Sequence, residues 1–145
     1  MDWWWTVLAL TAHLGPGEDD RWARVLTGLD LARAQAYATA DPDRLADVYA
    51  SPAAAADDAD TIEAFADRGG RVEGAVLLID ELSVIRSGRD EVVLDVVDRL
   101  GPAKVRWRDG RVARLPRDEP TRREIVLVPA DDGWRISRSR ERAPS

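Results

Sequence analysis

The sequence predicts an α+β domain in which three N-terminal helices pack on a mostly antiparallel sheet of five or six strands. Apolar residues recur with the 3.6-residue period of a helix as far as Gly69-Gly70, and from Arg71 onward they alternate with a period of two. Helices and strands in separate runs along the chain are typical of α+β folds, whereas a regular alternation of the two would indicate a parallel sheet.

The helical half begins with a helix over 21–40, on which the apolar residues from Trp22 to Ala40 share one face. Asp41-Pro42 ends this helix and starts a second, with the aspartate as N-cap and the proline in the first turn. We expect Ser51-Pro52 to stop the second helix, and Asp57 and Asp58 to cap a third.

The second half is predicted to be a series of antiparallel strands. Val72–Ile85 forms one long strand with a bulge near Asp80-Glu81, because its apolar alternation shifts by one residue there. Asp109-Gly110 predicts a two-residue hairpin loop that places Trp107 opposite Val112. The other expected strands are Glu91–Leu100 and a closing hairpin of Thr121–Val128 with Trp134–Ser139.

Composition excludes several function classes. The 145 residues contain no cysteine and one histidine, which excludes a disulfide scaffold, a thiolate zinc site and a thiol nucleophile, and favours neither a metal nor a cofactor. Residues 1–100 carry a net charge of −11 and residues 101–145 carry +5, giving −6 overall. The arginines of the second half alternate with apolar residues, so we expect them to coat the outer face of the sheet and predict no nucleic-acid partner.

Several local motifs of the sequence are distinctive: Trp22–Leu29, Arg33-Ala34-Gln35-Ala36, Asp41, Leu45–Tyr49, Arg68-Gly69, Val96–Leu100 and Gly133–Ile136. Together they resemble the nuclear transport factor two-like superfamily, the cone fold shared with ketosteroid isomerase and SnoaL-like proteins, and above all an actinobacterial branch of it. The resemblance implies an apolar, tryptophan-rich segment at 1–19, one cone-fold domain at 20–139 and a frayed tail at 140–145. The superfamily includes isomerases, hydrolases, dehydratases, cyclases and proteins without activity, so the resemblance does not choose a reaction.

Arg33 and Asp98 are the central candidate site residues. Arg33 falls inside the apolar stripe of the first long helix, and strand alternation turns Asp98 toward the same interior. Because a buried guanidinium requires a partner, we expect the two to meet inside the cone. This pair has two interpretations: an ion pair that fixes the helix on the sheet, or the centre of a ligand pocket with Tyr37, Tyr49 and Asp41 at its rim.

The favoured function is a non-catalytic module that binds a small apolar ligand or a partner protein. The alternative is a SnoaL-like isomerase, cyclase or hydrolase acting on a small apolar substrate, with Asp98 as base and Tyr37 or Tyr49 as hydrogen-bond donor. An arginine partner would lower the pKa of Asp98 and make it a poor base. Resemblance to epoxide hydrolases of the superfamily implies an Asp–Arg–Asp cluster, but alternation sends Asp95 and Arg99 to the face opposite Asp98.

The N-terminal run Trp3, Trp4 and Trp5 suggests a third role, docking on a partner protein or a membrane surface, or else a helix packed over the domain. The apolar stretch that it begins is too short to span a membrane and lacks a signal peptide's basic start, so we expect a cytoplasmic protein. The resemblance also implies a homodimer formed through the sheet.

Overall fold

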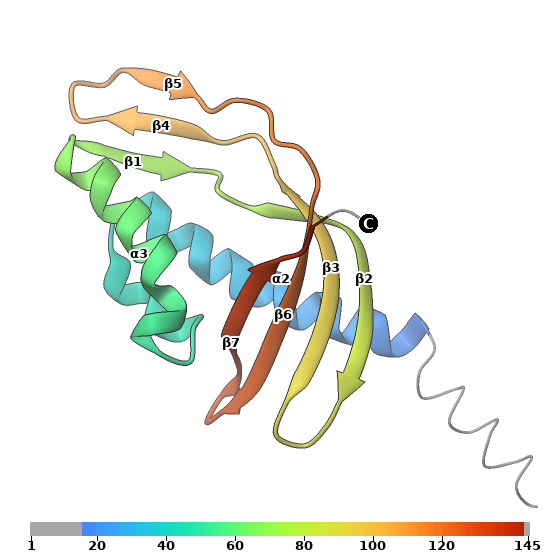
Figure 1. Cartoon of the computed structure of the whole chain (residues 1–145). Coiled ribbons are helices and arrows are strands. Elements are labelled where there is room, and N and C mark those ends of the chain that lie inside the picture. Colours follow the sequence, from blue (N-terminus) through green and yellow to red (C-terminus); the bar gives the residue numbers. More distant parts are fainter. Residues whose placement is uncertain (1–15, 144–145) are drawn as a thin grey trace, which may run out of the picture.

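The computed structural model describes residues 16–143 as two antiparallel sheets with helices packed against them (Figure 1). The α+β class is confirmed, with helices first and strands after them. In the described residues the strands number seven and are divided between two sheets. The elements are α2 (Pro16–Thr39), the 3₁₀ helix η1 (Pro42–Asp47), α3 (Pro52–Asp67), β1 (Gly70–Glu73), β2 (Leu77–Ser87), β3 (Val92–Leu100), β4 (Lys104–Trp107), β5 (Val112–Arg114), β6 (Thr121–Ala130) and β7 (Gly133–Glu141).

The strand expected at Val72–Ile85 is two strands in the structure, β1 and β2. The chain between β1 and β2 is interrupted at Gly74, whose positive φ of 78° breaks the extended conformation. As a result β1 joins a three-stranded sheet of order β1-β4-β5, and β2 joins a four-stranded sheet of order β2-β3-β6-β7. The predicted bulge at Asp80 is confirmed by the register shift between Ile79 and Glu81, and a second shift follows it along β2. Both bulges bend the strand.

The hairpin of β4 and β5 has a different register from the predicted one. Val112 pairs with Arg106 rather than with Trp107. The Trp107 N–H donates to the Arg111 carbonyl at 2.9 Å, which leaves three residues in the loop, and the last of them, Gly110, has a φ of 91°. A three-residue loop that ends in a left-handed glycine is the next commonest solution after the two-residue turn.

Helix α3 starts earlier than expected. The Ser51 hydroxyl accepts a hydrogen bond from the Ala54 N–H at 3.2 Å, and Pro52 occupies the first turn. Ser51-Pro52 therefore begins the third helix, and the prediction that Asp57 and Asp58 cap it is wrong. Both aspartates lie within α3, one turn and more beyond its start.

Helix α2 joins two separate hydrophobic cores. Its N-terminal half packs on the four-stranded sheet, where Trp22 meets Trp134 edge to face with ring centroids 4.9 Å apart. Its C-terminal half packs on η1, α3 and the three-stranded sheet through Ala36 and Tyr37. The turn of α2 between the two cores carries Asp30 and Arg33, so polar side chains enter the interior there. Among residues 16–143, no helix is long and apolar enough to cross a membrane.

Candidate functional site

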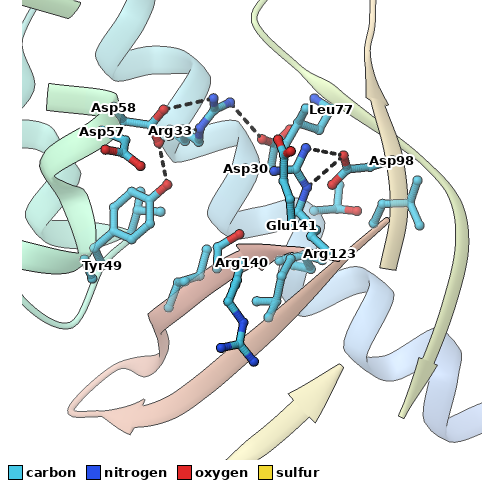
Figure 2. Close-up of a pocket in the computed structure, with 18 residues that line it drawn as sticks. Asp30, Arg33, Tyr49, Asp57, Asp58, Leu77, Asp98, Arg123, Arg140 and Glu141 are labelled. Carbon is cyan, nitrogen blue, oxygen red and sulfur yellow. Dashed lines mark hydrogen bonds and ion pairs between the residues drawn. The ribbon is translucent and has the colours of Figure 1, made fainter. Parts of the chain in front are cut away.

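A cavity of about 440 Å³ lies between α2, α3 and the inner face of the four-stranded sheet (Figure 2). Apolar side chains form part of its wall, and a set of charged side chains forms the rest. The apolar residues include Leu26, Val48, Ile79, Ile125 and Ile136, and the inward charged residues are Asp30, Arg33, Asp58, Asp98 and Arg123.

Asp58 is the centre of a fully paired cluster. Its two carboxylate oxygens accept from Arg33, from Nε at 2.8 Å and from Nη2 at 3.1 Å, which is a bidentate pair. The Tyr37 hydroxyl donates to Oδ1 at 2.6 Å and the Tyr49 hydroxyl donates to Oδ2. Burial alone would raise the pKa of Asp58, but these donors together hold it below its ordinary value. Burial and the charge of Asp58 raise the pKa of both tyrosines.

Asp30 ties α2 to the start of β2. Its Oδ2 accepts from the Leu77 N–H at 2.8 Å, and its Oδ1 lies 3.5 Å from Nη1 of Arg33. The same Nη1 donates to the Ala75 carbonyl at 3.3 Å. Burial raises the pKa of the Asp30 carboxyl more than the Leu77 N–H and Arg33 lower it. Asp30 therefore links the Asp58 cluster to the break between the two sheets.

Asp98 is 1% exposed and is only half paired. Its Oδ1 accepts from Nε of Arg123 at 3.1 Å and from Nη2 at 2.9 Å (Figure 2). Its Oδ2 has no hydrogen bond with any residue in the range 16–143. Burial raises the pKa of Asp98 and outweighs the charge of Arg123, so the prediction of a lowered pKa is wrong.

The predicted direct pair of Arg33 with Asp98 is also wrong. Both side chains line the same cavity, as expected from their periodicity, but each has a nearer partner on an adjacent element. Arg33 pairs with Asp58 on α3, and Asp98 pairs with Arg123 on β6. The interior thus holds two ion-pair groups in place of one.

The other predicted site residues have different outcomes. Tyr49 lines the cavity and Tyr37 reaches Asp58, but both hydroxyls already donate to that carboxylate, so neither can act as the predicted hydrogen-bond donor to a ligand. Asp41 does not lie at the rim: it caps η1, as its position before Pro42 predicts, and accepts from the Asp43 N–H at 3.1 Å. Trp3, Trp4 and Trp5 lie outside the described residues.

An Asp–Arg–Asp cluster does occur, but it is made of residues other than those considered from the sequence. Asp30, Arg33 and Asp58 form it. Asp95 and Arg99 pair elsewhere, with Arg122 and Asp80 respectively, and neither lines the cavity. Within residues 16–143 no group of three or more histidine, aspartate and glutamate side chains is arranged to hold a metal.

Asp58 and Arg123 are site residues that the sequence analysis missed, and each has a recognisable signal. With Ser51 as N-cap, Asp58 falls on the face of α3 between the buried residues Ala55 and Ile62. Arg123 alternates with Ile125 along β6 and pairs opposite Val96, so it points to the inner face and not to the outer one as expected.

Comparisons with known proteins support the fold described above. No family model matches the sequence, and no curated protein is significantly similar to it. The structure is similar to the intermembrane space region of the chloroplast protein ARC6, with a TM-score of 0.54, 13% identity and coverage of 86% of this chain and 96% of that one.

Two further solved structures are similar. A candidate aromatic ring hydroxylase from Novosphingobium aromaticivorans has a TM-score of 0.51 and 16% identity, with 90% of this chain and 93% of that one covered. A candidate calcium/calmodulin-dependent protein kinase II association domain from Xanthomonas campestris has a TM-score of 0.50 and 19% identity, with 84% and 87% covered. At these identities the likeness shows the fold alone.

Proposed function

We propose that this chain is a cone-fold module of the nuclear transport factor two-like kind that binds a small molecule in its cavity without transforming it. The observation that carries the proposal is the cavity itself. Its volume of about 440 Å³ falls in the range of about 300–1,000 Å³ that is usual for ligand pockets, and it combines apolar walls with a few converging polar groups.

The hydrogen bonding of the cavity favours binding over catalysis. Each interior carboxylate has a guanidinium partner, and Asp58 accepts from Arg33 and from two tyrosine hydroxyls. A general base or a hydrogen-bond donor must be free to reach a substrate. Groups committed to one another in this way hold a cavity open and shape it.

The alternative is a SnoaL-like isomerase, cyclase or hydrolase, and one observation favours it. Asp98 combines a pKa raised above its ordinary value with an Oδ2 that has no partner among the described residues, and a general base needs both a raised pKa and a free oxygen. Arg123 would then hold the carboxylate in position. Tyr37 and Tyr49 have no role in this version of the chemistry, because both donate to Asp58.

The test of binding uses a neutral fluorescent probe, N-phenyl-1-naphthylamine, and a pair of variants on α3. Ala54 lines the cavity and Ala53 beside it is exposed, so Ala54→Trp fills the cavity and Ala53→Trp is its matched control. We expect saturable fluorescence enhancement with the wild type and with Ala53→Trp, and none with Ala54→Trp. Equal enhancement in all three proteins would show that the dye binds elsewhere and would contradict the proposal.

Turnover separates the two functions. A ligand that is recovered from the purified protein and released unchanged after prolonged incubation supports a binding module. Conversion of that ligand by the wild type, lost in Asp98→Asn, supports the enzyme instead.

A further inference from the structure

The cavity contains more carboxylates than guanidinium groups. Three aspartates, Asp30, Asp58 and Asp98, face two arginines, Arg33 and Arg123. With all five groups ionised, the interior carries one uncompensated negative charge. An unpaired buried charge is costly, so it is normally relieved by a proton or by a positive partner.

The outer part of the wall does not supply the missing positive charge. Its charged residues are Asp57, Arg140 and Glu141, again one acid more than the bases. In Figure 2 the guanidinium of Arg140 points away from the Asp98–Arg123 pair. The lining of the cavity as a whole is therefore negative.

The surplus is localised at one atom. Asp58 uses both oxygens, and Arg33 spends its donors on Asp58, Asp30 and the Ala75 carbonyl. Arg123 directs two donors at the same oxygen of Asp98, Oδ1, and leaves Oδ2 as an acceptor without a described donor in a residue that is 1% exposed. Asp98 Oδ2 is not one of the fully buried, unpaired polar atoms of residues 16–143, so this acceptor is exposed to the cavity and a bound donor can reach it.

We propose, building on the ligand-binding function above, that the cavity takes an organic cation: a small apolar molecule with a protonated amine that donates to Oδ2 of Asp98. The ammonium group supplies both the missing donor and the missing positive charge. A neutral hydroxyl supplies the donor but leaves the charge uncompensated. A carboxylate or phosphate ligand adds to the negative charge of the lining and finds Oδ2 unsatisfied.

The protonation of the cavity agrees with this assignment. Burial raises the pKa of Asp98 and of Asp30, and the charge of Asp98 raises the pKa of Asp30 further. The charged groups that face Asp98 are Arg123 on β6, Arg33 and Asp30 on α2, and Asp118 in the loop before β6. A raised pKa means that Asp98 takes up a proton more readily than a free aspartate, and a bound ammonium takes the place of that proton.

The experiment compares three probes with one apolar body: 1-aminoadamantane, 1-adamantanol and 1-adamantanecarboxylate. Each displaces N-phenyl-1-naphthylamine from the wild-type protein, and we expect the amine to bind about tenfold or more tightly than the alcohol, and the carboxylate to bind weakest. Calorimetry of the amine in two buffers of different ionisation enthalpy should show proton release. Its affinity should rise with pH through the pKa of Asp98 while the amine stays protonated.

Two variants test the contact itself. Asp98→Asn should weaken the amine about 10- to 100-fold and change the alcohol about threefold at most. Asp60→Asn removes the same charge from an exposed position of α3 outside the cavity lining and should change the affinity for the amine about threefold at most. Binding of the neutral dye by Asp98→Asn verifies that the cavity is intact, and the comparison of probes on the wild type does not depend on any variant.

The outcomes are distinct for the two proposals. If the dye and all three probes fail to bind the wild type, the ligand-binding function is wrong. If the dye binds and the alcohol or the carboxylate binds as tightly as the amine, the cavity binds ligands but the inference of a cationic ligand is overturned.

Discussion

Removal of the Asp58 carboxylate should be among the most destabilising single changes in this chain. The Asp58→Ala variant leaves the Arg33 guanidinium with the Asp30 carboxylate at 3.5 Å and the Ala75 carbonyl at 3.3 Å, and leaves the Tyr37 and Tyr49 hydroxyls without their acceptor. The side chains of Arg33 and Asp58 are 17% and 13% exposed, so the exposed-pair estimate does not apply. Loss of one partner from a buried pair costs about 3–5 kcal/mol.

The free energy of unfolding is measured by urea denaturation followed through tryptophan fluorescence. With a dependence on urea of about 1–3 kcal/mol per molar, the loss should lower the midpoint by about 1–5 M. Asp57→Ala is the matched control, since the neighbouring aspartate is exposed and the change has the same effect on helix propensity. We expect it to stay within about 0.5 kcal/mol of the wild type. A cost below about 1 kcal/mol for Asp58→Ala would refute the argument that this cluster holds α3 on α2.

Three further predictions concern titration, backbone and assembly. Because the pKa of Asp98 is raised on folding, its contribution to stability is present at low pH and is lost as pH rises through the folded-state pKa. The wild type should therefore lose stability relative to Asp98→Asn from about pH 4 upward. A difference in the free energy of unfolding that stays constant with pH in urea titrations would contradict this. Gly74→Ala forces a positive φ on alanine and brings its Cβ to 2.8 Å from a backbone carbonyl oxygen, so it should destabilise the fold by about 1–3 kcal/mol. Gly28→Ala lies in open space on α2 and should stabilise the fold by about 0.5–1 kcal/mol. Thermal unfolding of the two variants and the wild type measures both effects. If the chain forms a homodimer through the sheet, as its resemblance implies, β2 offers the exposed side chains of Leu78 and Ile85, whose exposed fractions are 38% and 49%. Light scattering should then find a dimer that Ile85→Glu converts to a monomer. A monomeric wild type would contradict this prediction.

The parts of the fold that were predicted correctly are those with a local cause. The change of period at Arg71 marks the division between helices and strands. The bulge at Asp80 follows from a one-residue shift of the apolar alternation, which moves side chains to the other face whatever the strand pairs with. Asp41-Pro42 caps η1 as expected, because an N-cap needs only its own helix.

Errors arose where one local signal has two meanings. Ser-Pro can stop one helix or begin the next, and Ser51-Pro52 begins α3. That single choice moved Asp58 from a helix start to the inner face, and so the principal partner of Arg33 was missed. Asp109-Gly110 likewise serves a two-residue or a three-residue loop, and the choice shifted the pairing of Val112 by one position.

Partner choice inside the cavity is a tertiary property that periodicity does not determine. Periodicity correctly turned Arg33 and Asp98 toward the same interior, but it contains no information on which oppositely charged group lies nearest. Arg33 is closer to α3, which crosses beside α2, and Asp98 is closer to its neighbour strand β6. The direction of a side chain follows from the periodicity of its own element, whereas its partner depends on how two elements are placed.

The polar interior has two parts, the Asp58 cluster and the Asp98–Arg123 pair, and they differ in how completely their oxygens are paired. Replacement of a buried ion pair by apolar side chains is often neutral or stabilising, so five ionisable side chains beside two hydrophobic cores need a physical explanation. The Asp58 cluster is complete in itself, with every oxygen paired, and this is the behaviour of a group that fixes one helix on another. Asp98 is buried, carries surplus charge and keeps one oxygen unpaired within the described residues. An incomplete pair of this kind lowers stability unless something outside the chain completes it, and for this reason the proposal places the ligand at Asp98 and not at Arg33.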